Sequence, residues 1–453
     1  MGVRNKRIVV VGLGRSGVAT ARFLAARGAR VTVTDRAPAE TLKTAATALD
    51  GLGVELKLGG HDTTDFETAD LVVLSPGVPH TLPMLESAWA KGTPVIGEVE
   101  LACGYITEPI LAVTGTNGKT TTTELVGNML RKSGKNVFVG GNIGTPLIAY
   151  ADRSHARVDV VVAEISSFQL DTAIDFRPDI AVMLNITDDH LDRYPTFSAY
   201  ADSKWRIFEN QRPTDVAVLN AMDATVAALI KNRPPRARRE LFSDGVIEKG
   251  AQILKDRILL IEAGRHTGSF SLSESGLIGP HNRENTAAAC LAAREQGASD
   301  AGIQQAIDEF QGLPHRLETV GRVRGVRFVN DSKATNVDAV NRALECFDNP
   351  VILIMGGQNK KGDFTQLKSQ VRRRVKTLVA MGEAKDEIVT ALAGDPEKGI
   401  IEAGSMEEAV EKAFGAAMEG EIVLLSPACA SFDMFANYAQ RGNRFREIVE
   451  RLG

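Results

Sequence analysis

The 453-residue sequence contains little cysteine. Its four cysteines, Cys103, Cys290, Cys346 and Cys429, lie far apart in the chain, so no CxxC pair is available for a zinc or redox motif. A miniprotein stapled by disulfides is also excluded, because 43% hydrophobic and 24% charged residues are typical of an ordinary globular protein. We therefore expect four reduced thiols.

The sequence also lacks long apolar runs and an excess of basic charge. No apolar run approaches the roughly 18 residues of a membrane span, and residues 8–11 are too few for the core of a signal peptide. The 53 basic and 57 acidic residues give a net charge of −4, which argues against a nucleic-acid or membrane-surface binder. We expect a cytoplasmic monomer without such partners, in which a few local cations could still bind an anionic small substrate.

The length and the pattern of apolar runs predict three α/β domains. At roughly 150 residues per domain, the chain is long enough for about three. Short β-branched runs alternate with helical stretches in three successive units, as in parallel sheets covered by helices. We predict a Rossmann-like domain over residues 1–107, a central parallel-sheet domain of the P-loop ATPase type over 108–312, and a Rossmann-like domain over 313–453.

The first unit carries a glycine-rich motif. Gly12, Gly14 and Gly17 form a G-x-G-x-x-G sequence between a β-branched run and a helical stretch. Such glycines permit a tight turn and close approach of a phosphate, and the helix N-terminus favours negative charge. Asp35 lies about 20 residues further on, where such folds contact a ribose, and residues 75–79 (SPGVP) could line the same crevice. The motif predicts a nucleotide or diphosphate site; NAD is its commonest ligand, and a tight turn without a ligand is the alternative.

The second unit opens with a loop suited to phosphate. Residues 115–120 (GTNGKT) lie between a strand-like run and a helical stretch. In such loops, backbone N–H groups and the lysine, here Lys119, hold phosphate oxygens, and the hydroxyl of Thr120 reaches Mg²⁺. The loop departs from the common form G-x-x-x-x-G-K-[ST], whose first glycine would fall at Val113. It nevertheless predicts an ATP site with magnesium.

Acidic residues follow two strand-like runs in the same unit. Glu164 ends one of them, where a magnesium ligand belongs, although a lone glutamate there is more often a cap or a surface residue. A second cluster suited to a hard cation consists of Asp188, Asp189, His190 and Asp192; solvated acids around a helix start are the alternative. By residue pattern alone, Lys204 is an ordinary exposed lysine.

Together, these motifs resemble the Mur ligase family, ATP-dependent amide-forming ligases of cell-wall synthesis. The resemblance rests on GTNGKT, on ExSSFQL at 164–170, on NITxDHLDR at 185–193 and on the lysine downstream, and it covers nearly the whole chain. Further strings resemble the D-glutamate-adding branch of the family: VGLGRSG at 11, SPGVP at 75, GGNIGTP at 140, GLPHRLE at 312, NDSKATN at 330, GGQNKKGDF at 356 and SPACASFDMFANYAQRG at 426. The resemblance implies that ATP drives the addition of D-glutamate to UDP-N-acetylmuramoyl-L-alanine through an acyl phosphate.

The resemblance also implies roles for individual residues. The implied ATP contacts are Gly115, Thr116, Asn117, Gly118, Lys119, Thr120, Thr121, Asn282, Asn285, Arg316 and Asp331. The implied ligands of two Mg²⁺ ions are Thr120, Glu164, His190 and a carbamylated Lys204, and the implied catalytic residues are Lys119, Glu164, His190 and Lys204. The implied contacts to the UDP-sugar are Ser16, Asp35, Arg36, Gly77 and Asn142. The implied D-glutamate contacts are His190, Thr335, Lys360, Ser431 and Tyr438, with Lys361 as an alternative to Lys360 and a role for Tyr438 that is mainly through its backbone.

Three other functions fit part of the sequence. A nicotinamide-dependent oxidoreductase would explain the G-x-G-x-x-G motif and Asp35 but not residues 115–120. A P-loop ATPase that moves partner proteins would leave the strings at 330 and 426 without a role. A sister ligase that adds a different amino acid is the third alternative, and the C-terminal strings weigh against it.

Overall fold

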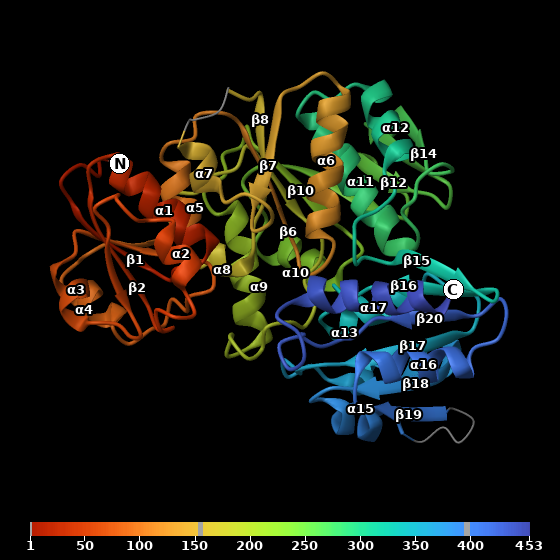
Figure 1. Cartoon of the computed structure of the whole chain (residues 1–453). Helices are drawn as coiled ribbons and strands as arrows, with labels where there is room; N and C mark the ends of the chain where they lie inside the picture. The colour runs from red at the N-terminus through yellow and green to blue at the C-terminus, as the bar shows by residue number, and fades with distance from the viewer. Residues whose placement is uncertain (1, 153–156, 394–398) are drawn as a thin grey trace.

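The computed structural model describes residues 2–152, 157–393 and 399–453, and it contains three α/β units along the chain (Figure 1). The first unit is a parallel sheet of five strands in the order β3-β2-β1-β4-β5. Its strands are β1 (Arg7–Val11), β2 (Arg30–Asp35), β3 (Glu55–Leu58), β4 (Leu71–Leu74) and β5 (Val95–Gly97). Its helices are α1 (Arg15–Ala26), α2 (Lys43–Thr47), α3 (Thr63–Thr68), α4 (Leu85–Ala90) and α5 (Glu98–Cys103).

The second unit is a nine-stranded sheet in the order β14-β13-β12-β11-β10-β9-β6-β8-β7. Its strands are β6 (Ile110–Thr114), β7 (Val137–Gly141), β8 (Val160–Glu164), β9 (Ile180–Met183), β10 (Val216–Asn220), β11 (Arg238–Ser243), β12 (Gly250–Ile253), β13 (Arg257–Glu262) and β14 (Arg265–Ser271). Its helices are α6 (Lys119–Lys132), α7 (Leu147–Ala151), α8 (Ser167–Leu170), α9 (Phe197–Trp205), the 3₁₀ turn η1 (Arg206–Phe208), α10 (Ala224–Asn232), α11 (Pro280–Glu295) and α12 (Asp300–Glu309).

The third unit is a six-stranded sheet in the order β15-β16-β20-β17-β18-β19. Its strands are β15 (Glu318–Val323), β16 (Val326–Asn330), β17 (Val351–Gly356), β18 (Val375–Met381), β19 (Gly399–Ala403) and β20 (Ile422–Leu425). Its helical segments are α13 (Val337–Leu344), η2 (Phe364–Leu367), α14 (Lys368–Arg374), α15 (Lys385–Leu392), α16 (Met406–Ala416) and α17 (Tyr438–Leu452).

These sheets confirm the predicted three-domain α/β architecture. The central strands β6, β8, β9 and β10 are buried along their whole length, as expected for β-branched runs covered on both faces by helices. The two larger sheets are not wholly parallel, because β13 and β14 form an antiparallel edge and β15 pairs antiparallel with β16. The predicted domain boundaries at 107 and 312 fall between the sheets, and their positions remain predictions.

The N-terminal domain is joined to the central domain by a shared apolar core. One cluster of buried side chains runs from Val10 and Phe23 of the first domain to Ile148 and Tyr200 of the second. Glu98 on α5, which is only 2% exposed, accepts the backbone N–H of Ile148 at 2.7 Å. These two domains therefore form one body.

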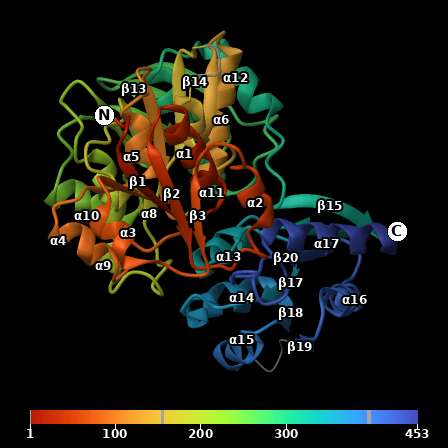
Figure 2. The same ribbon diagram turned by 60° about the vertical axis from the view of Figure 1, so that its left-hand side comes forward.

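The C-terminal domain has separate cores on the two faces of its sheet. One core lies under α13 and α15, and the other lies under α16 and α17. Figure 2 shows this domain below the other two, with α13 at the border with the central domain. Because its cores are its own, the domain can move as a unit. Within the described residues, no helix is long and apolar enough to cross a membrane.

Candidate active site

The predicted phosphate loop lies between β6 and α6, as the sequence indicated. Gly118, with a φ of +85°, directly precedes α6, whose first N–H groups have no side-chain cap. A Cβ at Gly118 would lie 2.2 Å from the Asn285 side chain, so only glycine allows α11 to approach the loop this closely. Exposed N–H groups at a helix N-terminus favour an anion.

Two lysines meet at the carbonyl of Gly115. The Nζ atom of Lys119 donates to the Gly115 and Thr116 carbonyls at 2.8 Å, and the Nζ atom of Lys204 donates to the Gly115 carbonyl, also at 2.8 Å. Lys204 is 2% exposed, so the structure places it in the site and not on the surface. Burial lowers the pKa of Lys204 well below its usual value, and the neighbouring Lys119 acts in the same direction.

Glu164 ends β8 beside the phosphate loop. It is 2% exposed, and its carboxylate accepts the Thr120 hydroxyl at 2.7 Å and the Asn142 amide at 2.8 Å, both uncharged donors. A buried carboxylate beside a P-loop hydroxyl suits Mg²⁺, which usually takes one or two carboxylates and completes its shell with phosphates and water. Among the residues described, no group of three or more His, Cys, Asp or Glu could hold a metal by itself.

His190 and Asp189 belong to the segment that follows β9. Burial lowers the pKa of His190 to about 4, so its imidazole is neutral at pH 7 and has a lone pair free for a metal or a hydrogen bond. The carboxylate of Asp189 accepts the Lys360 ammonium at 2.8 Å. Although burial acts to raise it, Lys360 and His190 bring the pKa of Asp189 to about 2. The C-terminal domain thus supplies a cation to the central domain.

A central cavity of about 290 Å³ is lined by most of the residues predicted to bind phosphate, metal or D-glutamate. Its lining includes the predicted residues Thr116, Asn117, Gly118, Lys119, Thr120, Asn142, Glu164, His190, Lys204, Arg316, Thr335 and Lys360. Three of these come from the C-terminal domain, and Arg316 among them donates to the Thr120 hydroxyl at 2.7 Å. The cavity therefore lies between the central and C-terminal domains.

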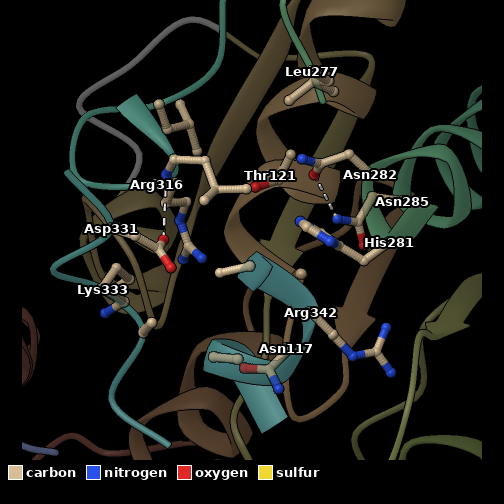
Figure 3. A pocket seen from close by; sticks show the side chains of 16 residues that line it. Asn117, Thr121, Leu277, His281, Asn282, Asn285, Arg316, Asp331, Lys333 and Arg342 are labelled. Atoms are coloured by element: carbon tan, nitrogen blue, oxygen red, sulfur yellow. Dashed lines mark hydrogen bonds between the residues drawn. The ribbon is translucent and has the colours of Figure 1, made fainter. Parts of the chain in front are cut away.

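A second cavity lies between the phosphate loop and α11 and contains four further predicted nucleotide contacts, Thr121, Asn282, Asn285 and Asp331 (Figure 3). Its lining includes Asn117, Gly118, Thr121, Asn282, Asn285, Arg316 and Asp331. The predicted contact Gly115 lines neither cavity; its carbonyl accepts hydrogen bonds from Lys119 and Lys204. Burial raises the pKa of Asp331 to about 7, although Ser426 and the Leu317 N–H donate to its carboxylate. The cavity measures about 70 Å³, whereas pockets for small ligands usually measure about 300 to 1,000 Å³.

A third cavity of about 680 Å³ lies at the carboxyl ends of β1, β2 and β4 in the N-terminal domain. Its lining includes all five residues predicted to hold the UDP-sugar: Ser16, Asp35, Arg36, Gly77 and Asn142. Asp35 also has a structural task, since its carboxylate accepts the N–H groups of Leu13 and Ala37 at 2.7 and 2.8 Å. Asn142 lines both this cavity and the central one, so the two are neighbours.

Sequence models of three domains match the chain in order. The Mur ligase MurD-like N-terminal domain matches residues 6–97, the Mur ligase middle domain matches 113–293, and the Mur ligase glutamate ligase domain matches 315–429. The chain belongs to the Mur ligase family. The resemblance found in the sequence is thereby confirmed, and this Mur ligase is covered by family domains over most of its length.

Curated relatives and solved structures agree with this assignment. The chain is 50% identical over 449 residues to the UDP-N-acetylmuramoylalanine–D-glutamate ligase of Desulfosudis oleivorans, covering 99% of this chain and 97% of the relative. It is 49% identical to the ligase of the same name from Desulfatibacillum aliphaticivorans, over 100% of both chains. In fold, it is similar to the UDP-N-acetylmuramate–alanine ligase of Thermotoga maritima, with a TM-score of 0.62, 19% identity and coverage of 99% and 100%.

Two residues that the sequence did not predict, Arg193 and Lys333, also line the cavities of this Mur ligase. Arg193, from the central domain, lines the third cavity, which we call the UDP-sugar cavity after its predicted ligand; its guanidinium lies 4.1 Å from the centre of the Phe168 ring and donates to the Gly77 carbonyl at 3.1 Å. Lys333 lines both the central cavity and the second cavity, which we call the nucleotide cavity after its predicted ligand. Burial lowers the pKa of Lys333 to about 7, and Arg316 acts in the same direction. Arg193 and Lys333 lie within the family-like strings at 185 and 330, so membership of those strings was the one sequence feature that could have pointed to them.

The predicted D-glutamate contacts are only partly brought together in this Mur ligase. His190, Thr335 and Lys360 line the central cavity. Ser431 is buried and Tyr438 begins α17, but neither lines one of the cavities described above; the Tyr438 ring lies 3.8 Å from the Lys333 ammonium. Their contacts to an amino acid remain predictions.

Proposed function

We propose that this Mur ligase adds D-glutamate to UDP-N-acetylmuramoyl-L-alanine, at the expense of ATP, in peptidoglycan precursor synthesis. The curated relatives that match it over its full length have this activity in their names. The structural observation that carries the proposal is the arrangement of the cavities. The central cavity shares Asn142 with the UDP-sugar cavity, and it shares Asn117 and Arg316 with the nucleotide cavity.

A fourth cavity supplies a place for the third substrate. It measures about 350 Å³, and it shares Thr335, Asp189 and Lys360 with the central cavity. Lys361 lines this fourth cavity but not the central one. The arrangement therefore favours Lys360 as the cation nearest to the reaction, and Lys361 as a residue further from it.

The chemistry requires activation of a carboxylate, which is a poor electrophile. An oxygen of the L-alanine carboxylate attacks the γ-phosphorus of ATP, and ADP leaves. The amine of D-glutamate then attacks the acyl carbon, phosphate leaves and the amine loses a proton. In this chain, Lys119 and Arg316 would neutralise the transferred phosphoryl group, and Asn142 would hold the carboxylate in line with it.

The residues around Glu164 fit magnesium. Thr120, Glu164 and the neutral His190 would hold it, and a bound Mg²⁺ would neutralise phosphate charge. We assign two ions, with a carbamate on Lys204 as a further oxygen ligand. The buried position of Lys204 and its lowered pKa support this assignment. In its unmodified form, the ammonium could only repel a cation.

The remaining expectations concern location and assembly. We propose a cytoplasmic enzyme that works as a monomer. Sedimentation of the purified protein with its substrates measures the assembly, and a dimer required for activity would contradict the proposal.

Release of phosphate with a panel of amino acids tests the proposed function. With UDP-N-acetylmuramoyl-L-alanine and ATP, we expect release that requires D-glutamate, and none with L-glutamate, D-aspartate or glycine. Release without an amino acid would favour a P-loop ATPase, and release with a different amino acid would favour a sister ligase. NADH oxidation, followed by absorbance, should be absent; its presence would favour the oxidoreductase.

Arg36→Ala should impair binding of the UDP-sugar more than binding of ATP. A lost hydrogen bond to a charged group costs about 1.5–3 kcal/mol, so the KM for the UDP-sugar should rise about 10- to 100-fold while the KM for ATP changes little. Arg30→Ala, an exposed residue at the start of β2, is the matched control. Asp35→Ala should act in the same direction, with an added structural effect because Asp35 holds the Leu13 N–H. Selective loss of ATP affinity would contradict the assignment of this cavity.

Lys360→Ala should weaken binding of D-glutamate selectively. A buried carboxylate that loses its cation is destabilised by several kcal/mol, so we expect the KM for D-glutamate to rise at least about 100-fold. Because Lys360 also pairs with Asp189, the melting temperature should be measured beside the kinetics. Lys361→Ala is the matched control, and a larger effect there would assign the role to Lys361.

A further inference from the structure

Helix α13 and its N-cap residue carry several of the polar contacts between the C-terminal and central domains. Asn336 caps this helix by accepting the Ala339 N–H at 2.8 Å, while its amide donates to Asp189 of the central domain at 3.0 Å. One turn further along, Arg342 lies 3.6 Å from Glu284 of α11. Asp338 lies between these two positions.

The carboxylate of Asp338 connects three elements. A single oxygen accepts the Asn117 side-chain amide at 2.8 Å, the Thr187 hydroxyl at 3.1 Å and the Arg342 guanidinium at 2.9 Å. Asn117 is part of the phosphate loop, and Thr187 follows β9. Asp338 therefore receives two hydrogen bonds from the central domain and one from its own helix.

These contacts belong to a closed arrangement of the domains. The nucleotide cavity, about 70 Å³, lies between the phosphate loop and residues of α13 such as Ala339 and Arg342. The adjoining central cavity shares Asn117, Gly118 and Arg316 with it, so a nucleotide that spans the two cavities would be enclosed by both domains. Entry of such a ligand is favoured when the C-terminal domain moves away. The separate cores of that domain allow it to move as a unit. Movement would break both bonds from Asp338 to the central domain.

We propose that Asp338 is a positioning residue that fastens the C-terminal domain to the phosphate loop in the closed state and sets the orientation of Asn117 beside the nucleotide. The inference rests on the function proposed above only in taking ATP as the ligand that enters the cavity. A carboxylate holds the domain more strongly than a neutral acceptor would, because hydrogen bonds to a charged group are about twice as strong as those between neutral groups. Closure matters to the reaction because an acyl phosphate is lost if water reaches it.

A double-mutant cycle between Asp338 and Thr187 tests the contact in the reaction. We expect Thr187→Val to lower kcat/KM for ATP about 10-fold and Asp338→Ala to lower it at least as much, because a single hydrogen bond to a charged group contributes about 1.5–3 kcal/mol. Because both changes remove the same contact, the double variant should be no worse than Asp338→Ala alone. Glu345→Ala, at the other end of α13 and in contact with Gln370 of its own domain, should leave the kinetics unchanged. Additive effects, or an Asp338→Ala variant with native kinetics, would overturn the proposal.

Small-angle X-ray scattering tests closure without any turnover. With a non-hydrolysable ATP analogue at saturating concentration, the native protein and Glu345→Ala should become more compact, and Asp338→Ala should remain expanded. Equal compaction of all three proteins would overturn the proposed role of Asp338 in domain closure. The scattering experiment needs neither D-glutamate nor the UDP-sugar, so failure of the proposed ligase reaction would leave this test intact.

Discussion

Lys119→Ala should lower the rate of phosphate release about 10²- to 10³-fold, as expected when one donor to developing negative charge is removed from a preorganised site. Lys119 begins α6, and within the described residues its ammonium donates hydrogen bonds only to the carbonyls of Gly115 and Thr116. When phosphate is bound, the same ammonium can turn from these carbonyls to the phosphate oxygens. Phosphate release is measured with all three substrates at saturation.

Two controls separate a chemical effect from a structural one. Lys119→Met keeps the apolar part of the side chain and should be as inactive as the alanine variant, while retaining the native melting temperature. Lys132→Ala, at the far end of the same helix, removes an exposed lysine that pairs with Glu309 and should keep full activity. Normal phosphate release by Lys119→Met would contradict the role of the loop.

Local patterns in the sequence predicted much of this molecule. The glycines at 12 and 17 are demanded by the turn before α1, since a Cβ at Gly17 would lie 1.9 Å from the Gly12 carbonyl oxygen. Motifs of this kind depend on residues close in sequence, so their consequences can be read without a structure. The fold class followed for the same reason, because buried parallel strands need continuous apolar runs.

Contacts between domains could not be predicted from local sequence patterns. Asp338, Arg193 and Lys333 each act across a boundary that sequence spacing does not describe. The ion pair of Lys360 with Asp189 joins residues 171 positions apart. The antiparallel strands at the sheet edges were missed as well, since edge pairing depends on which strands are left unpaired when the sheet is built.

Lys204 is a residue whose position was predicted by the family resemblance but not by its local residue pattern. Its residue pattern indicates an exposed lysine, and only the family resemblance placed it in the site. In the structure, Lys204 lines the central cavity and is 2% exposed; its ammonium lies 4.8 Å from the centre of the Tyr200 ring and 2.8 Å from the Gly115 oxygen. Its role in the reaction remains a prediction. No carboxylate bonds to this ammonium in the described residues. A buried lysine without an ion-pair partner is costly as a cation.

That cost makes Lys204 suited to react with CO₂. A lysine whose pKa is lowered by burial is partly neutral, and its amine can attack the carbon of CO₂ and lose a proton to give a carbamate. The product carries a negative charge and two oxygens, which magnesium prefers over nitrogen. We expect the intact protein, measured by mass spectrometry under native conditions, to gain the mass of one CO₂, and Lys204→Ala to lack that gain.

Lys204→Ala should lose most of its activity, about 10²-fold or more, because it cannot form the proposed carbamate and so lacks the oxygen ligand that the carbamate would give the metal. Formate or acetate added at high concentration should restore part of it, since a free carboxylate fits the space left by the side chain and supplies the missing oxygens. The same additives should not restore Lys119→Ala, whose defect is a missing cation. Lys204→Arg, which keeps a positive charge and cannot form a carbamate, should stay inactive. A fully active Lys204→Ala variant, or equal rescue of Lys119→Ala, would contradict the carbamate.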